Sequence, residues 1–424
     1  MTASPRFPRL DDWLEWQQSL HPNPIDLGLE RVSRVLGRTG WRHPRQPVIT
    51  VGGTNGKGSC VALLDALLRA GGYRVGTFTS PHLVDYRERI RLDGAQVSEA
   101  SLIAAFERIA DALEGDSLTF FEFNTLAALL VFETWAPDAV VLEVGLGGRL
   151  DAVNIVDADV AVVVSVAPDH MEWLGSDLES IGREKAGIFR RARPAVCGMA
   201  EPPRALSDVA EEVGALLLLR GRDFDLVEHA DGRWDFRDAH GALTRLPPPA
   251  LEGVAQTGNA ATALAALRQL PDRLPLDRAA IELGLGSARL PGRFQRVPGA
   301  GGIEWVLDVA HNPAAAATLA ANLARHAVPG RTVAVCGMLD DKDVGGVLVA
   351  LRDRVDRWFA ATTEGPRGLA DTALAARARA VGVEMVAAGS VTDAMARAAR
   401  DARAGDRIVV FGSFHTVGPA LACV

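Results

Sequence analysis

The chain has 424 residues, of which 48% are hydrophobic and 23% charged, so it has an ordinary globular composition and enough length for two domains. Its formal charge of -8 argues against a general nucleic-acid-binding surface. The N-terminal residues lack the basic-then-apolar pattern of a signal peptide, and no apolar run approaches the roughly 18 residues of a membrane span. We therefore expect neither nucleic acid nor membrane as a partner.

The four cysteines, Cys60, Cys197, Cys336 and Cys423, lie far apart in the sequence. Their spacing fits neither a set of metal ligands nor a disulfide scaffold. This pattern is typical of a reducing compartment, so we expect a cytoplasmic protein.

A glycine-rich loop follows the first predicted strand. Residues 1–47 contain one short amphipathic stretch, at 27–36, and leave little room for a separate domain. The β-branched run 48–51 then leads into Gly52-Gly53-Thr54-Asn55-Gly56-Lys57-Gly58-Ser59, and an amphipathic run follows at 60–68. Such a loop binds phosphate through its backbone N–H groups, the N-terminus of the next helix and the lysine.

The loop departs from the Walker pattern, because Gly58 separates Lys57 from Ser59 and Val51 stands in place of the first glycine. We interpret it as a variant ATP-binding loop. The alternative is a plain glycine-rich turn before a helix.

Strand-like runs then alternate with helical patterns, at 73–79, 139–144, 160–166 and 194–198. Their continuous Val, Ile and Leu are typical of strands buried on both faces, which predicts a parallel sheet covered by helices. At about 221–246, Trp234 and Phe236 follow an Asp231-Gly232 turn, which predicts a β-hairpin. Two helical patterns follow, at 258–270 and 277–285.

The clearest break in composition lies at 290–302, which is rich in glycine and contains two prolines, and we expect a hinge there. A second alternation follows, with strands near 303–308, 332–337, 357–361 and 407–412. The predicted fold class is α/β, with a mostly parallel, P-loop-type sheet domain over residues 1–290 and a smaller Rossmann-like α/β domain over residues 291–424.

Polar residues follow the strands of the first domain. Ser80 comes after the second strand, Glu143 ends the third, and His170 follows the fourth. Because the carboxyl ends of parallel strands share one edge of the sheet, we expect these side chains to lie near the phosphates. A hydroxyl, a carboxylate and an imidazole could hold one or two Mg²⁺ ions with water. Taken singly, each has an ordinary alternative, as a turn serine or a hydrogen-bonded histidine.

Four charged or titratable residues lie elsewhere. Lys185 is in a helical pattern and, taken alone, would be a solvent-exposed helix lysine. Arg293 follows Pro291-Gly292 and could reach a phosphate, although loop arginines mostly face solvent. Asp308 and His311 follow the first strand of the second domain, where an acid can hold a ribose hydroxyl and a histidine can reach phosphate.

Together these ordered motifs resemble the folylpolyglutamate synthase/dihydrofolate synthase branch of the Mur ligase superfamily, over nearly the whole chain. The matching segments are 25–32, 54–59, 79–83, 121–123, 143–154, 169–170, 183–190, 258–261, 290–295, 308–313 and 412–415. The loop's departure from the Walker pattern is this family's own. The resemblance implies a carbon–nitrogen ligase that uses ATP to add L-glutamate to dihydropteroate and to tetrahydrofolate or folylpolyglutamates, through an acyl phosphate.

The resemblance also implies roles for individual residues. It implies ATP phosphates on Thr54, Asn55, Gly56, Lys57, Gly58 and Ser59, adenine near Asn259, ribose at Asp308, and further phosphate contacts from Arg293 and His311. It implies pterin contacts from Ile25, Asp26, Leu27, Phe121, Glu122, Leu150, Asp151 and Ala152. It implies Mg²⁺, expected as two ions, on Ser80, Glu143, His170 and a carbamylated Lys185, with a monovalent cation as a further candidate. The implied catalytic residues are Lys57, Asp151, His170 and Lys185.

Two other functions remain as alternatives. Cell-wall amino-acid ligases of the same superfamily carry a nucleotide-sugar-binding domain before the phosphate loop, whereas only about fifty residues precede it here, well short of a typical domain. A nucleotide-dependent switch protein would hydrolyse ATP without needing pterin or glutamate. We expect a monomeric enzyme.

Overall fold

The computed structural model describes residues 6–424. Internal contacts divide the chain into two compact units. The first contains the chain up to Ser80, Tyr86–Ala250 and Thr257–Ala288, and the second contains Pro81–Asp85, Leu251–Gln256 and Arg289–Val424. Two short segments that precede the predicted hinge therefore belong to the second unit.

The first unit is organised around an eight-stranded sheet with the order β4-β3-β2-β5-β1-β6-β7-β8. Its strands are β1 (Val48–Gly52), β2 (Val75–Phe78), β3 (Ile90–Leu92), β4 (Ala95–Gln96), β5 (Ala139–Glu143), β6 (Val160–Val163), β7 (Pro194–Cys197) and β8 (Leu216–Leu219). All neighbours pair in parallel except β3, which is antiparallel to β2 and β4. The predicted mostly parallel sheet is confirmed, and β1 lies buried between β5 and β6.

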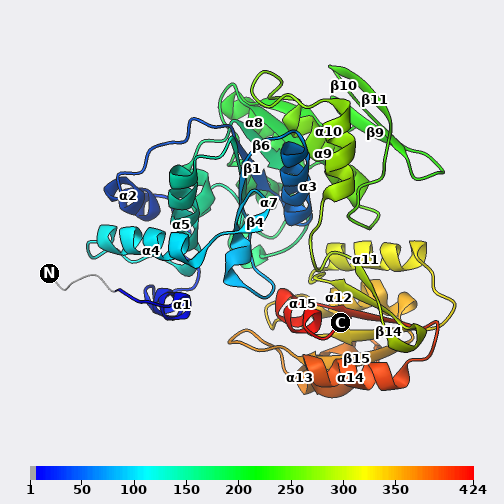
Figure 1. The fold of residues 1–424 in the computed structure, drawn as a ribbon. Coiled ribbons are helices and arrows are strands. Elements are labelled where there is room, and N and C mark those ends of the chain that lie inside the picture. The colour runs from blue at the N-terminus through cyan, green and yellow to red at the C-terminus, as the bar shows by residue number, and fades with distance from the viewer. Residues whose placement is uncertain (1–5) are drawn as a thin grey trace. The chain divides into compact units, whose positions relative to one another are not determined.

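Four helices share one hydrophobic core with the sheet. They are α1 (Leu10–Ser19), α2 (Glu30–Arg38), α4 (Glu99–Ala112) and α5 (Phe120–Trp135), and Figure 1 shows α2, α4 and α5 grouped together. Trp13 and Phe123 are fully buried in this core. Only one helical stretch is predicted before the first strand, so α1 is an addition to the predicted fold. Its charged residues dilute the apolar pattern, and burial depends on Trp13 packing against Phe106.

The remaining helices of this unit pack around the rest of the sheet. They are α3 (Lys57–Ala70), α6 (Met171–Leu174), α7 (Leu178–Ala186), α8 (Arg204–Val213), α9 (Gln256–Leu267) and α10 (Arg278–Ser287), with 3-10 turns at η1 (Tyr86–Arg89) and η2 (Ala152–Ile155). Helix α3 contacts β1, β2 and β5 and packs beside α10, whereas α7 packs beside α8. The helix that follows the glycine-rich loop is thus anchored along its length.

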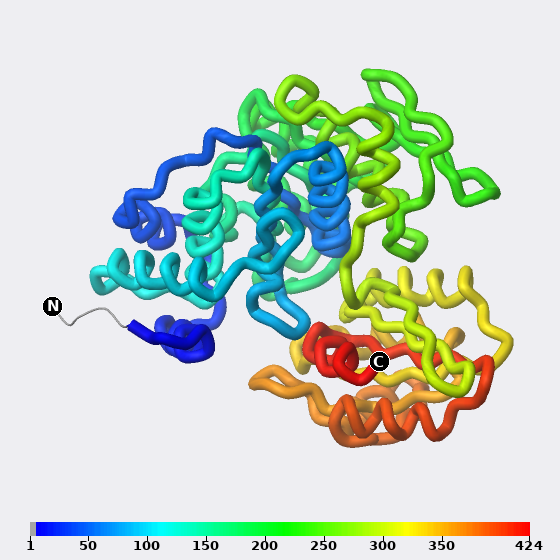
Figure 2. Tube along the Cα trace, viewed as in Figure 1, coloured from blue at the N-terminus to red at the C-terminus, as the bar shows by residue number. Residues whose placement is uncertain are grey.

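The predicted hairpin at about 221–246 is a three-stranded antiparallel sheet instead, with the order β11-β10-β9. Its strands are β9 (Phe224–Glu228), β10 (Trp234–Asp238) and β11 (Gly241–Leu246). Figure 2 shows this segment as a green arm. The Asp231-Gly232 turn joins β9 to β10 as expected, but β11 was missed because its mostly exposed residues lack apolar alternation.

The second unit contains a six-stranded sheet with the order β12-β13-β17-β14-β15-β16. Its strands are β12 (Gln295–Pro298), β13 (Glu304–Asp308), β14 (Thr332–Cys336), β15 (Arg357–Thr362), β16 (Met385–Ser390) and β17 (Arg407–Phe411). Only β12, at the edge, pairs antiparallel. Strands β12 and β16 were not predicted, because one is short and polar and the other has few branched residues.

Helices cover both faces of this second sheet. One core contains α11 (Pro313–Arg325), α12 (Val344–Leu351) and α13 (Asp371–Ala380), and the other contains α14 (Val391–Asp401) and α15 (Phe414–Leu421). Short 3-10 turns occur at η3 (Ala300–Gly302) and η4 (Arg352–Arg354). This arrangement is the doubly wound α/β fold that the sequence predicted.

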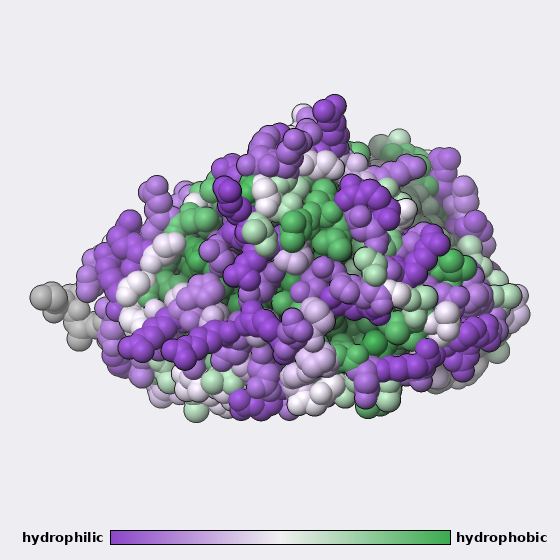
Figure 3. All heavy atoms as spheres, turned by 90° about the horizontal axis from the view of Figure 1, so that it is seen from above, coloured by the Kyte–Doolittle hydropathy of each residue, from purple (hydrophilic) through white to green (hydrophobic). Residues whose placement is uncertain are grey.

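On the face shown in Figure 3, hydrophilic and hydrophobic residues are interspersed. Across the described residues, every helix is too short or too polar to cross a bilayer.

Candidate active site

The glycine-rich loop connects β1 to α3, as the sequence predicted. Gly53 and Gly56 adopt positive φ angles of 144° and 84°, which side chains rarely tolerate. A β-carbon at Gly56 would lie 3.0 Å from Oδ1 of Asn259, so the structure brings Asn259, from α9, against the loop. Lys57 Nζ donates to the carbonyl oxygens of Gly53 and Thr54, at 3.0 and 3.2 Å. The Lys57 side chain therefore folds back onto the loop that precedes it, and helix α3 begins at Lys57 itself.

Ser165, which the sequence analysis did not single out, anchors the loop. Its hydroxyl accepts a hydrogen bond from the Asn55 N–H at 2.9 Å and donates to the Asn55 carbonyl at 2.8 Å. Thr54 adds three bonds to the same segment: its N–H donates to the Ser165 carbonyl, its hydroxyl donates to the Ala167 carbonyl, and it accepts from the Ala167 N–H. Ser165 lies two residues after the end of β6, inside the run 160–166 that was predicted to be a strand, and a serine within an apolar run was the available signal. Its role follows from the pairing of β1 with β6.

Glu143 and Ser80 lie together at the carboxyl ends of β5 and β2. The Ser80 N–H donates to Glu143 Oε2 at 3.2 Å, and Glu143 is only 4% exposed. No group of three His, Cys, Asp or Glu side chains within residues 6–424 is arranged to hold a metal. Mg²⁺ commonly binds one or two protein groups and completes its shell with water and substrate phosphates, so an adjacent carboxylate and hydroxyl fit that donor chemistry.

His170 lies in a strained turn after β6. It adopts a left-handed conformation, with φ 51° and ψ 40°, immediately before α6. Its N–H bonds Asp169 Oδ1 at 2.9 Å, and its Nε2 lies 3.9 Å from the same oxygen. Such backbone strain in a non-glycine residue is often found at functional sites. β6 neighbours β1, so His170 follows a strand that ends at the same edge of the sheet as the phosphate loop.

Lys185 is buried, with only 3% of its surface exposed, although a solvent-exposed position was the ordinary expectation for a helical lysine. Burial, together with the charge of Lys57, lowers its pKa to about 7. Asp169 and Asp151 act in the opposite direction. Lys57, Asp169 and Asp151 are therefore all within electrostatic range of Lys185. The chain contains three lysines, Lys57, Lys185 and Lys342, and all its other basic side chains of this kind are arginines. The scarcity of lysine could have drawn attention to Lys185 at the sequence level.

Asp151 is also buried, and it organises the loop that follows β5. Its Oδ2 accepts from the Leu146 N–H at 2.7 Å, and its Oδ1 accepts from the Val153 N–H at 3.0 Å at the start of η2. Burial raises its pKa to about 6, against the opposing effect of these backbone donors and of Lys57. Asp151 thus holds the loop through two backbone hydrogen bonds, and its pKa lies within about one unit of neutral pH. Leu150 and Ala152 flank it in the same loop.

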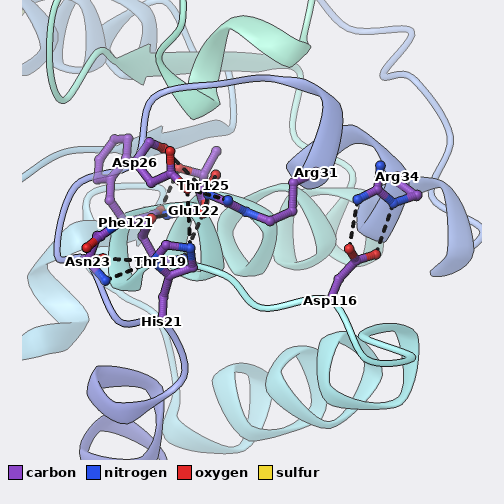
Figure 4. Close-up of polar contacts among 10 residues, drawn as sticks. All are labelled: His21, Asn23, Asp26, Arg31, Arg34, Asp116, Thr119, Phe121, Glu122 and Thr125. Carbon is purple, nitrogen blue, oxygen red and sulfur yellow. Dashed lines mark hydrogen bonds and ion pairs between the residues drawn. The ribbon is translucent and has the colours of Figure 1, made fainter.

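The other predicted pterin residues lie on two elements. Phe121 is in the first turn of α5, and its ring covers Gly145, where a β-carbon would meet the ring at 2.5 Å. Glu122, next to it, is buried and belongs to the capping box of α5. Asp26 lies between Ile25 and Leu27 in the irregular segment before α2. Figure 4 shows that Arg31 joins Asp26 to Glu122, and the sequence analysis had assigned no role to Arg31.

Arg293, Asp308 and His311 come together within the second unit. Asp308 accepts hydrogen bonds from the N–H groups of Phe294 and Ala310, both at 2.8 Å, and so ties the end of β13 to the 292–295 turn. Burial raises the pKa of Asp308, and the nearby charges of Arg293 and His311 oppose that rise. The Arg293 guanidinium lies over the Phe414 ring at 5.1 Å.

Comparisons with known proteins agree with this arrangement. Residues 51–202 match the Mur ligase middle domain and residues 292–414 match the Mur ligase glutamate ligase domain. The chain is 48% identical to the dihydrofolate synthase/folylpolyglutamate synthase of Escherichia coli strain K12, over 96% of this chain and 94% of that protein.

Two solved structures are also similar over nearly their full length. An E. coli FolC structure in complex with DHPP and ADP has a TM-score of 0.93 and 47% identity, covering 99% of this chain and 98% of that one. A Yersinia pestis bifunctional folylpolyglutamate synthase/dihydrofolate synthase complexed with AMPPNP and Mn ion has a TM-score of 0.91 and 45% identity, covering 99% of both chains.

The fold and the phosphate loop define an ATP-dependent ligase built from Mur ligase domains. Within that class, the chain belongs to the dihydrofolate synthase/folylpolyglutamate synthase family, as the sequence motifs indicated. It is an ATP-dependent ligase that attaches glutamate to pterin-containing acids and forms ADP and phosphate.

Proposed function

We propose that one active site in this chain adds L-glutamate both to dihydropteroate and to tetrahydrofolate or folylpolyglutamates, through an acyl phosphate. The observation that carries this proposal is the buried Lys185 within electrostatic range of Asp151, Asp169 and the phosphate-loop Lys57. The substrate carboxylate attacks the γ-phosphate of ATP and ADP leaves. The glutamate amine then attacks the acyl carbon and releases phosphate. No protein nucleophile is needed.

Each unit supplies residues that fit ATP. In the first unit, the N–H groups of residues 54–59 receive the phosphates, Lys57 turns from the loop carbonyls to the transferred phosphate, and Asn259 borders adenine. In the second unit, Asp308 holds the ribose, and Arg293 and His311 contribute positive charge to the phosphates. The main barrier is repulsion between two anions, so these fixed cations and amide dipoles lower it.

Ser80, Glu143 and His170 would hold Mg²⁺, and we propose two ions. A divalent cation supplies charge neutralisation between the phosphates and the attacking carboxylate. The role of the chain is to hold Glu143 through the Ser80 N–H and to fix His170 beside Asp169. The Mn and AMPPNP in the Yersinia pestis structure support a divalent cation and ATP; a monovalent cation is a further proposal.

We propose that Lys185 is carbamylated. The Lys185 ammonium first releases one proton to solvent. The neutral Nζ then attacks CO₂, a nitrogen–carbon bond forms, and a second proton leaves Nζ, so that a cation becomes an anion. The burial of Lys185 and its pKa of about 7 support this step, because the reaction needs an unprotonated amine. The carbamate then attracts the metal ions that an ammonium would repel.

The pterin group is proposed to contact Ile25, Asp26 and Leu27 together with the first turn of α5 and the Leu150-Asp151-Ala152 loop. DHPP in the E. coli FolC structure supports a pterin-type ligand. We further propose a cytoplasmic monomer without nucleic-acid or membrane partners; the four cysteines are unpaired thiols, as a reducing compartment would leave them. Size-exclusion chromatography with light scattering tests the monomer.

ADP release tests the function directly. The purified chain should release ADP only when a pterin acid and L-glutamate are both present, with dihydropteroate and tetrahydrofolate each accepted and each competing with the other. Activity on one substrate alone would refute the dual assignment. Steady ATP hydrolysis that ignores both pterin and glutamate would instead support a nucleotide-dependent switch.

A further inference from the structure

The segment at residues 21–28 connects α1 to α2 without regular structure. No backbone–backbone hydrogen bond involves these residues anywhere in the described chain. Pro22 and Pro24 lack N–H groups, which removes two donors. Side chains must therefore hold the segment that carries Asp26.

Arg31 provides the main anchor. Its Nη1 donates to Asp26 Oδ2 at 2.6 Å, and its Nη2 donates to Glu122 Oε1 and Oε2 at 2.8 and 2.9 Å (Figure 4). Arg31 itself lies in the first turn of α2, which is fixed in the hydrophobic core by Val32, Val35 and Leu36. A rigid helix therefore presents one guanidinium to two carboxylates.

Glu122 is a firm partner for Arg31. It is 3% exposed, and its Oε2 also accepts the Thr119 N–H at 2.7 Å in the capping box of α5. A carboxylate buried this deeply needs a positive partner, because an unpaired charge in the interior is strongly unfavourable. Asp26, by contrast, keeps 40% of its side chain exposed, and the Arg31 hydrogen bond lowers its pKa. Arg31 thus connects a partly exposed loop carboxylate to a buried helical one.

His21 reinforces the start of the segment. Its Nδ1 lies 2.9 Å from the Asn23 carbonyl oxygen, and its Nε2 lies 3.3 Å from Asp26 Oδ2. Figure 4 shows His21 and Arg31 approaching Asp26 from two different elements of the chain. The polar contacts that hold the segment therefore converge on Asp26, and the shortest of them is the one with Arg31.

We propose that Arg31 is a positioning residue for the pterin substrate. It holds the 25–27 segment at a set distance from the first turn of α5, where Phe121 lies, without contacting the substrate. This inference rests on the proposed pterin contacts of these two segments. A bidentate arginine suits the task, because lysine has no planar fork with which to bind two carboxylates at once.

The test compares Arg31→Gln with Arg34→Ala in the full-length enzyme. Arg34 lies on the same helix and makes a similar two-pronged contact, at 3.0 and 2.7 Å, with Asp116. Asp116 lies in neither segment proposed to bind pterin. If Arg31→Gln leaves the segment in its binding conformation about one tenth of the time, the KM for dihydropteroate rises about tenfold. The KM for ATP should stay unchanged, and Arg34→Ala should alter neither constant.

Arg31→Lys keeps the charge and should give an intermediate KM for dihydropteroate. If Arg31→Gln does not fold, the KM values for dihydropteroate and ATP are compared in Arg31→Lys instead. Hydrogen exchange at residues 25–29 should quicken in the Arg31 variants and not in Arg34→Ala. A folded Arg31 variant with an unchanged KM for dihydropteroate, or with equal increases for dihydropteroate and ATP, would overturn the inference. Failure of the wild-type chain to use dihydropteroate would instead refute the proposed function.

Discussion

Replacing Lys185 tests the most unusual electrostatic feature of the site. A lysine with the ordinary pKa of 10.5 would have about one neutral amine in a thousand at pH 7.5. With the pKa lowered to about 7, about three quarters of the amines are neutral at that pH. Burial and the nearby Lys57 therefore raise the reactive fraction by nearly three orders of magnitude.

Carbamylation can be observed without measuring activity. Protein equilibrated with ¹³C-bicarbonate should show one carbamate carbonyl signal that disappears in Lys185→Arg. Lys342→Arg should retain the signal, because Lys342 lies in the second unit, on the loop after β14. An unmodified Lys185 in active, CO₂-equilibrated enzyme would refute the reasoning.

Activity should follow the modification. Lys185→Arg keeps a positive charge where an anion is proposed, so we expect turnover to fall by about 10–100-fold, as for residues that support a metal site. Bicarbonate-free buffer should lower the rate of the wild-type enzyme, and added bicarbonate should restore it. Wild-type turnover in Lys185→Arg would exclude any catalytic need for the carbamate.

Three further substitutions test other parts of the site. Lys57→Ala should lower ADP release by about 10²–10³-fold with an unchanged circular dichroism spectrum, and normal turnover would reject the phosphate-loop assignment. Since the pKa of Asp151 rises from 3.8 to about 6 on folding, this group should cost the native state up to about 3 kcal/mol as the pH rises from 4 to 7. Urea unfolding should show that loss in the wild type and not in Asp151→Asn; parallel pH profiles would contradict it. Asp308→Ala leaves the N–H groups of Phe294 and Ala310 without acceptors and should destabilise the second unit by about 2–3 kcal/mol in denaturant unfolding. A change below about 0.5 kcal/mol would show that these bonds are replaced.

Much of the fold could be predicted because local pattern and topology agree. Continuous apolar runs identified β1, β5 and β6, and their parallel pairing places the residues that follow them at one edge of a sheet. That argument anticipated Ser80 beside Glu143. It failed where strands are short or polar, as in β11 and β12, because edge strands gain their stability from pairing rather than from an apolar face.

The residues of the candidate site could be predicted from the sequence, but their burial and their pKa values could not. The pattern around Lys185 is that of any amphipathic helix turn, and only tertiary packing, in which the backbone of α7 lies against Gly148 of the loop after β5, leaves this lysine buried. Asp151 likewise reads as a loop carboxylate, whereas burial raises its pKa to about 6.

The sequence by itself determined the phosphate loop, the buried strands with the residues at their ends, and the alternation of these strands with helices, because these depend on backbone preferences and on apolar patterns along the chain. The tertiary structure alone decided which charges are buried and which are joined. Arg31 and Glu122 are 91 positions apart, and Asn55 and Ser165 are 110 apart. Contacts between residues so far apart in the sequence depend on how the helices and strands pack together. The pKa values and the hydrogen bonds of the site follow from that packing.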